Sequence, residues 1–198
     1  LTAPTFAEYE RTLSGAEIRV HNLRETDGFA LTERILDEIS PDLDAVYLCN
    51  PNNPTGRTAQ PELLREIVRK CTENGVKLVV DECFLDFLAA RDALTAKTVL
   101  RDAPNLIILK AFTKLYAMAG VRLGYALCSN TALLAKMQAA GQPWGVSSLA
   151  QAAGAAALRE TAYADAVRAL IADQRPKLAA GLRALGLQVI EGSANYLL

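Results

Sequence analysis

Lys114 lies in a stretch of small and apolar residues, KAFTKLYAMAGVRLGY, that also contains Arg122. A lysine forms an imine with an aldehyde once it has lost its proton, and apolar neighbours favour that loss by desolvating the amine. The expected neighbours are Phe112, Leu115, Tyr116 and Met118. An arginine guanidinium is a permanently charged, planar group that binds phosphate. This pairing suits pyridoxal phosphate, although a solvated loop lysine and a surface arginine would give the same pattern.

Two other stretches place polar groups directly after apolar, strand-like runs. Asp81 ends the run LVVD, and an aspartate there can pair with a protonated pyridine nitrogen, which makes the ring an electron sink. Asn53 belongs to NPNNPTG, which follows the run 45–49, and its amide could reach the ring hydroxyl. Found alone, Asp81 could cap the next segment and Asn53 with Pro54 could form an ordinary turn. Found together and in order, they favour one binding site.

The ordered motifs PNNPTG, VVDE, FTK and AGVRLGY resemble the fold-type I pyridoxal-phosphate aminotransferase family. The resemblance implies that pyridoxal phosphate is the cofactor and that Lys114 is the Schiff-base lysine. It places Asp81 at the pyridine nitrogen and Asn53 at the ring hydroxyl. The match covers nearly the whole chain.

The same resemblance implies Thr113 and Arg122 as phosphate ligands and Phe6, in APTF, as the aromatic residue that stacks on the ring. Two positions depart from the family's pattern. Phe84 stands where most members have a tyrosine, so a hydrogen bond to the ring hydroxyl is missing and the Schiff base should keep its proton to a higher pH. Ala111 stands where Ser or Thr often binds the phosphate, so other donors are needed.

Within the family, the chain resembles the branch that contains threonine-phosphate decarboxylase and histidinol-phosphate aminotransferase. The stretches DECFLDF, KAFTKLYAMAG and PWGVSSLAQAAGAAAL are closer to the decarboxylase subgroup. This branch implies a phosphorylated amino acid or amine as substrate and a homodimer as the assembly. The family's upstream phosphate-binding loop and its downstream substrate-binding arginine have no counterpart here, so we interpret the chain as the central part of an enzyme.

The predicted elements alternate between strands and helices, which indicates an α/β fold with a mostly parallel sheet and helices on both faces. The resemblance identifies this as the large domain of the aspartate-aminotransferase-like fold. Strands are predicted at 18–23, 45–49, 76–80, 106–109 and 124–128. Helices are predicted at 6–14, 31–39, 62–74, 131–140, 147–159 and 163–185. The candidate residues follow strand ends, where open α/β sheets form their ligand crevice.

Two parts of different kinds are expected along the chain. Residues 1–160 form the cofactor-binding large domain, with its N-terminal part apparently missing. Residues 161–198 form a connecting helix and the beginning of a smaller α+β domain, with strands at 187–190 and 196–198. Pro176 marks a kink or a boundary between two helices in this part.

Charge and residue usage exclude several other classes of function. The 21 Lys and Arg residues nearly balance the 22 Asp and Glu residues, so there is no electrostatic case for a nucleic-acid or membrane partner. Four scattered cysteines without a CxxC motif favour a reducing compartment, and hence the cytoplasm. His21 is the single histidine, so neither a Ser-His-Asp site nor a multi-histidine metal centre can be built.

Alternatives remain open at this point. The sequence does not choose between decarboxylation and transamination, because the contacts that orient the substrate lie mostly outside these residues. A regulator that keeps this fold as a ligand-sensing domain is a second class of interpretation. A nucleotide-binding α/β domain is disfavoured, because no GxGxxG or GxxxxGK[ST] motif follows a strand.

Overall fold

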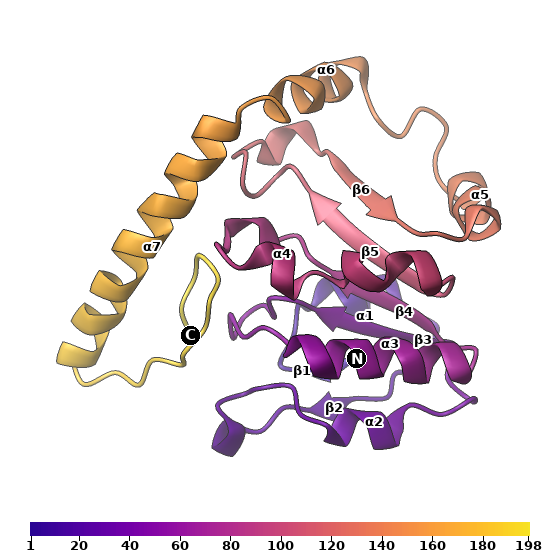
Figure 1. Cartoon of the computed structure of the whole chain (residues 1–198), viewed down its shortest axis with the longest axis horizontal. Coiled ribbons are helices and arrows are strands. Elements are labelled where there is room, and N and C mark those ends of the chain that lie inside the picture. The colour runs from indigo at the N-terminus through magenta and orange to yellow at the C-terminus, as the bar shows by residue number, and fades with distance from the viewer.

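A central sheet of four strands in the order β3-β4-β5-β6 organises the computed structural model, which describes residues 1–198 (Figure 1). Three neighbouring strands are parallel: β3 (Ala45–Cys49), β4 (Lys77–Asp81) and β5 (Leu106–Ala111). β6 (Gly124–Leu127) runs antiparallel to β5 at the edge of the sheet. β1 (Thr2–Ala3) and β2 (His21–Asn22) form a separate parallel pair. The predicted α/β class and mostly parallel sheet are confirmed.

Seven α-helices connect or flank these strands, and each helix predicted from the sequence is present. They are α1 (Glu8–Thr12), α2 (Arg34–Glu38), α3 (Pro61–Glu73), α4 (Arg91–Leu94), α5 (Thr131–Ala140), α6 (Ser148–Ala157) and α7 (Thr161–Ala184). Their starts have local causes: Pro61 occupies the first turn of α3, and the side chains of Asn130 and Ser147 cap α5 and α6. Short 3₁₀ turns lie at η1 (Glu25–Asp27), η2 (Leu85–Phe87), η3 (Ala96–Asp102) and η4 (Ala119–Val121).

The main core lies between α3 and one face of the sheet. Alternate strand residues share a face, so the apolar stripe of α3 meets Val46, Leu48, Leu78, Val80, Leu106 and Ile108. Val79 and Ile107 are buried on the opposite face, which α1 approaches through the Tyr9 ring beside Tyr47. Burial of both faces explains why these strands read as continuous apolar runs. Each fully buried Leu or Ile contributes about 1.5–3 kcal/mol.

A second, smaller core connects α7 with the loops that follow β4 and β5. It consists of Leu85, Phe87, Leu88, Leu115 and Ala164, with Phe84, Tyr116, Val167 and Ile171 packed against it. Residues of three distant stretches of sequence therefore share one apolar cluster.

The end of the chain differs from the prediction. Segments 187–190 and 196–198 do not form strands, because a strand needs a neighbouring backbone and here only one ladder-like bond joins them, from Ile190 N to Leu198 O at 2.7 Å. The backbone N–H of Ser193 instead donates to Gly56 O at 2.6 Å, so this segment returns from α7 to the loops of the sheet (Figure 1). α7 runs continuously through Pro176, so of the two alternatives expected at that residue, a kink or a boundary between two helices, the boundary is wrong.

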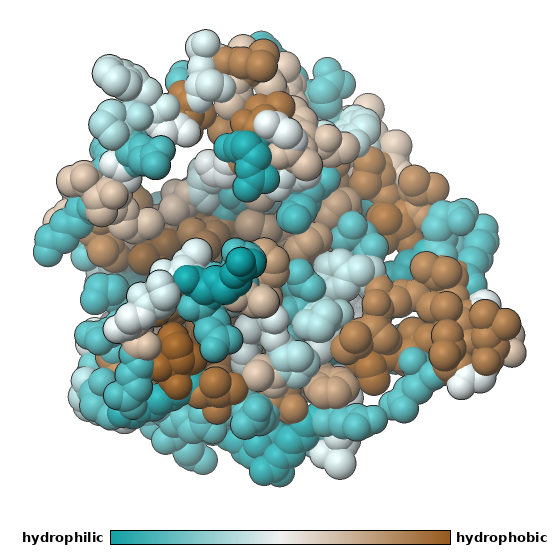
Figure 2. Space-filling model, turned by 180° about the vertical axis from the view of Figure 1, so that it is seen from behind, coloured by the Kyte–Doolittle hydropathy of each residue, from teal (hydrophilic) through white to brown (hydrophobic).

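The second half of the chain is packed less tightly than the first. α5 buries none of its residues, and Trp144 is 96% exposed. Figure 2 shows hydrophobic surface gathered over the side of the molecule where α7 lies, in keeping with the exposed Leu170, Leu178 and Leu185. None of the helices combines the length and the apolar character that crossing a lipid bilayer requires.

Candidate active site

The candidate site is built at the carboxyl ends of the three parallel strands. Cys49, the last residue of β3, pairs in register with Asp81, the last residue of β4, and Asp81 pairs with Leu109 of β5. Since these strands run in one direction, the segments that follow them emerge at the same edge of the sheet. The sequence placed its candidates after these strands, and the edge is the expected position of a ligand crevice.

Asp81 is held by hydrogen bonds to both of its carboxylate oxygens. The Tyr9 hydroxyl donates to Oδ2 at 2.7 Å, and the backbone N–H of Cys83 donates to Oδ1 at 2.9 Å. Burial, followed by the nearby Cys49 and Asp81, raises the pKa of Tyr9 well above its ordinary value, so the phenol remains a neutral donor. The half-buried carboxylate keeps acceptor capacity for one more donor, as the proposed pairing with a pyridine nitrogen requires.

Phe6 presents an aromatic ring at the rim of the site. Its side chain is 40% exposed, and its ring meets the Tyr9 ring edge to face, with centroids 5.5 Å apart and planes at 84°. The preceding backbone is fixed by Asn52, whose Nδ2 donates to Pro4 O at 2.9 Å and whose Oδ1 accepts from Thr5 Oγ1 at 2.9 Å. An exposed aromatic residue on an anchored loop suits the stacking role implied by the resemblance.

The loop NPNNPTG divides its asparagines between structure and the candidate site. Asn50 is buried; it accepts from Ala59 N at 3.0 Å and donates to Leu94 O at 3.3 Å. Asn52 joins the loop to the segment before Phe6. Asn53 is half-buried and its side chain makes no hydrogen bond within the chain, so its amide is available to a ligand.

Lys114 lies over the Phe84 ring, with Nζ 4.9 Å from the ring centroid. Its side chain is exposed, so the desolvation expected from four apolar neighbours is not found. The physical reason is that Phe112 and Leu115 are themselves buried in the protein and do not cover the amine. Phe84 also meets Tyr196 edge to face at 5.0 Å, which places a residue from the end of the chain at the site.

The predicted phosphate ligands lie on a more open loop. Arg122 is exposed, and its Nη1 donates to Ala119 O at 3.3 Å, which leaves the other guanidinium donors free. Thr113 is half-buried and makes no side-chain hydrogen bond. Arg122 and Ala117 adopt left-handed backbone conformations, with φ of 56° and 52°, a strain of about 1 kcal/mol each that often occurs at functional sites. Ala111 offers no side-chain donor, as expected.

The residues fit pyridoxal phosphate, with more groups at the ring end of the site (Phe6, Asn53, Asp81 and Lys114) than at the phosphate end (Thr113 and Arg122). Asn53, Asp81 and Lys114 follow the ends of three neighbouring strands, and Phe6 packs on Tyr9, which holds Asp81. Sequence reasoning missed Tyr9 and Tyr196. Tyr9 had a signal, because in the helix predicted at 6–14 its spacing of three from Phe6 would place both residues on one face, although the observed helix begins at Glu8. Tyr196, whose hydroxyl donates to Asn52 O at 3.0 Å, had none.

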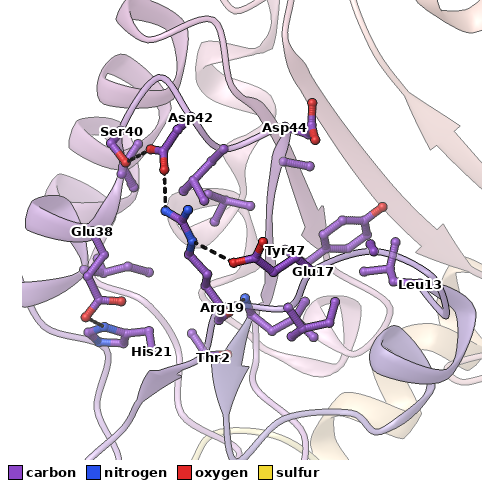
Figure 3. A pocket seen from close by; sticks show the side chains of 18 of the residues that line it. Thr2, Leu13, Glu17, Arg19, His21, Glu38, Ser40, Asp42, Asp44 and Tyr47 are labelled. Carbon is purple, nitrogen blue, oxygen red and sulfur yellow. Dashed lines mark hydrogen bonds and ion pairs between the residues drawn. The ribbon is translucent and has the colours of Figure 1, made fainter.

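A separate groove of about 750 Å³ lies between the β1-β2 pair, α2 and β3 (Figure 3). None of the predicted site residues lines it. Some of its charged groups form ion pairs: Arg19 contacts Asp42 at 2.6 Å, and His21 Nδ1 lies 2.8 Å from Glu38, whereas Asp37 and Asp44 line the groove without an ion pair. His21 is a strand residue, as the sequence predicted. We therefore take the strand edge, where the predicted residues lie, as the candidate catalytic site, and not this groove.

Comparison with known proteins identifies the family of the chain. The sequence profile of the family "Aminotransferase class I and II" matches residues 1–198. Threonine-phosphate decarboxylase from Salmonella typhimurium is 40% identical over 201 residues, which cover 100% of this chain and 55% of that protein. Histidinol-phosphate aminotransferase from a Geobacillus species is 34% identical over 203 residues, covering 100% of this chain and 54% of the relative. The chain thus spans about half the length of the relatives it matches.

Solved structures agree with the fold. Histidinol-phosphate aminotransferase from Clostridium acetobutylicum superimposes with a TM-score of 0.91 at 27% identity, over 98% of this chain and 58% of the other. A double mutant of aspartate aminotransferase from Thermus thermophilus gives a TM-score of 0.85 at 26% identity, over 98% of this chain and 52% of the other. The match along the whole sequence and the shared fold lead to one conclusion: the chain belongs to the class I and II aminotransferase family of pyridoxal-phosphate-dependent enzymes.

Proposed function

We propose that the protein uses this chain to bind pyridoxal phosphate and to act on a phosphorylated amino acid or amine. The observation that carries the proposal is the Asp81 carboxylate, fixed on both oxygens at a strand end and flanked by the loops that carry Phe6, Asn53 and Lys114. When bound, pyridoxal phosphate supplies an electron sink, which accepts the electron pair of the bond that is broken in the substrate.

The residues of the chain have distinct roles in this proposal. Lys114 would hold the cofactor through Nζ and, when free, would hold or return a proton at that atom. Asp81 would face the pyridine nitrogen and Asn53 the ring hydroxyl. Arg122 and Thr113 would hold the phosphate. The exposed side chain of Lys114 supports this role, because its amine can reach an incoming aldehyde.

We further propose decarboxylation of threonine phosphate as the reaction, with transamination of histidinol phosphate as the alternative. The decarboxylase from Salmonella is 40% identical to this chain, against 34% for the Geobacillus aminotransferase. The stretch DECFLDF, with Phe84 over Lys114, is the local feature that favours the decarboxylase. A role in cobalamin synthesis would follow from that substrate.

Formation of a covalent adduct at Lys114 tests the cofactor proposal. The intact protein is incubated with pyridoxal phosphate, reduced with borohydride and digested for peptide mapping. The adduct should map to Lys114, disappear in Lys114→Ala and persist in Lys136→Ala, which removes an exposed lysine of α5. Lys110 should remain unmodified, because it is buried and paired with acids. An adduct at Lys136 alone would contradict the proposal.

Two substrate assays separate the alternatives. Phosphothreonine is supplied to the intact protein and carbon dioxide is measured; histidinol phosphate with 2-oxoglutarate is supplied separately and glutamate is measured. Carbon dioxide alone supports the decarboxylase, and glutamate alone supports the aminotransferase. If neither product forms although Lys114 carries the cofactor, both substrate assignments are wrong and the cofactor site stands.

The assembly and the compartment are further parts of the proposal. We expect a homodimer, since Trp144 and Leu149 expose apolar surface that a second subunit could cover. Sedimentation of the intact protein tests this, and a monomer at all concentrations would contradict it. The four free cysteines suit the reducing cytoplasm. The division into a large domain at 1–160 and the start of a small domain at 161–198 remains a prediction.

A further inference from the structure

We infer that Tyr9 is a positioning residue of the cofactor site: one side chain orients the Asp81 carboxylate and fixes the Phe6 ring beside it. This inference rests on the proposed function, because it assigns Tyr9 a role only if Asp81 and Phe6 contact the cofactor. Neither the family match nor the named relatives assign a role to this tyrosine.

The contact between Tyr9 and Asp81 is short and shielded from water. The hydroxyl donates to Asp81 Oδ2 at 2.7 Å, and the tyrosine side chain is 7% exposed. The second oxygen of the carboxylate accepts from the backbone N–H of Cys83 at 2.9 Å. With both oxygens held, the carboxylate loses its rotational freedom before any ligand arrives, and this preorganisation lowers the entropic cost of binding.

The ring of Tyr9 has a second partner. Phe6 packs edge to face on it at 5.5 Å, and Tyr47 of β3 lies on another side at 6.0 Å. The hydroxyl group of Tyr9 therefore acts on the residue that faces the pyridine nitrogen, while its ring acts on the residue that stacks on the pyridine face. These two effects are separable, since Tyr9→Phe removes the hydroxyl and keeps the ring.

A purely structural role is the competing interpretation. The bond could simply attach α1 to the end of β4, two segments far apart in the sequence. A structural anchor would affect every ligand of the site equally. A positioning residue affects only a ligand that presents a ring nitrogen to Asp81.

The test therefore compares pyridoxal phosphate with the analogue in which carbon replaces the ring nitrogen. Dissociation constants are measured by fluorescence titration for the intact wild-type protein, Tyr9→Phe and Tyr47→Phe. Tyr47→Phe is the matched control, because its hydroxyl makes no hydrogen bond within the chain and its ring adjoins Tyr9. We expect Tyr9→Phe to raise the dissociation constant of pyridoxal phosphate about tenfold, which is the scale of one hydrogen bond to a charged group. The dissociation constant of the analogue should rise less than about twofold.

A double-mutant cycle with Asp81→Asn provides a second, independent measurement. If Tyr9 acts through Asp81, Tyr9→Phe should add little to the loss of pyridoxal-phosphate affinity already caused by Asp81→Asn. Thermal unfolding of the ligand-free proteins checks that each variant is folded.

Two results would overturn the inference: an equal loss of affinity for both compounds in Tyr9→Phe, or no loss for either. Additive effects in the double mutant would also overturn it. A wild-type protein that binds neither compound would instead refute the proposed function, so the two failures are distinguishable.

Discussion

The Asp81 end and the Arg122 end of the candidate site are built in opposite ways. Asp81 ends the middle strand of three parallel strands, and its carboxylate is held by Tyr9 and Cys83. Arg122 precedes the edge strand β6 on an exposed loop, where it adopts a left-handed conformation. Contacts within the chain thus fix the Asp81 carboxylate at the ring end, whereas the phosphate end has an exposed guanidinium with free hydrogen-bond donors.

A buried cluster of charged residues, which includes Glu82 directly after Asp81, adds to the rigidity of the ring end. Lys110 Nζ lies 2.9 Å from Asp86 and 3.3 Å from Glu82, which is fully buried and also accepts from Ala96 N at 2.7 Å. Burial alone would lower the pKa of Lys110, but the hydrogen bond and charge of Asp86, with the charge of Glu82, raise it. Arg168 of α7 donates to Asp86 O at 3.1 Å, so the cluster also ties α7 to the segment that carries Phe84.

The largest effect is expected from removing the charge of Lys110. Lys110→Met leaves Glu82 buried without its counter-ion, so the free energy of unfolding should fall by about 3–5 kcal/mol. Urea denaturation measures it. Lys177→Met is the control, because its pair with Asp173 is exposed and should cost less than about 1 kcal/mol. Equal losses in both variants would contradict the view that the ring end is the rigid end.

At the phosphate end, a substitution should change the affinity for pyridoxal phosphate with little change in the free energy of unfolding. Arg122→Gly removes the guanidinium and also the left-handed strain, so pyridoxal phosphate should bind about 10–100-fold more weakly while the unfolding free energy stays within about 1 kcal/mol. Fluorescence titration and urea denaturation measure the two quantities. Arg122→Lys, which keeps a charge without the planar fork, should lie between. Unchanged affinity in Arg122→Gly would remove this residue from the site.

The ring end should also respond to alkaline pH. Burial, and then the charge of Asp81, raise the pKa of Cys49 from 9.0 to about 11, so the folded state favours the neutral thiol. Its contribution is fully present below pH 9 and is lost as the pH rises toward 11, which amounts to about 1 kcal/mol by pH 10. Denaturation at pH 8 and pH 10 should show a smaller loss in Cys49→Ala than in the wild type. An identical loss in both proteins would show that Cys49 is not responsible.

The smallest effect concerns the contact of the chain's last residues with the site. Tyr196→Phe removes the hydrogen bond to Asn52 O but keeps the ring against Phe84, so stability should fall by about 0.5–1 kcal/mol. Hydrogen exchange should become faster in residues 192–198. Tyr163→Phe, at an exposed tyrosine of α7, should change neither quantity. Unchanged exchange in Tyr196→Phe would mean that other contacts hold this segment.

The sequence by itself determined the central strands and the residues that follow them. Apolar runs such as 76–80 and 106–109 predict strands buried on both faces, because a continuous run of apolar side chains is a local feature that can be read from the sequence. Once those strands are parallel, the segments just after them emerge at one edge, so the sequence predicts that Asp81, Asn53 and Lys114 lie at the same edge of the sheet. Helix positions followed from periodicity and caps in the same way.

Only the tertiary structure decided how these residues are held. The bond from Tyr9 to Asp81, the contact of Tyr196 with Asn52 and the pairing of Lys110 with Glu82 join segments that no local pattern relates. Exposure of Lys114 and the loss of the two expected C-terminal strands also depend on which distant backbone lies nearby. Local propensity selects the elements, but the burial and hydrogen bonds of each side chain arise from contacts between elements, and these exist only once the chain is folded.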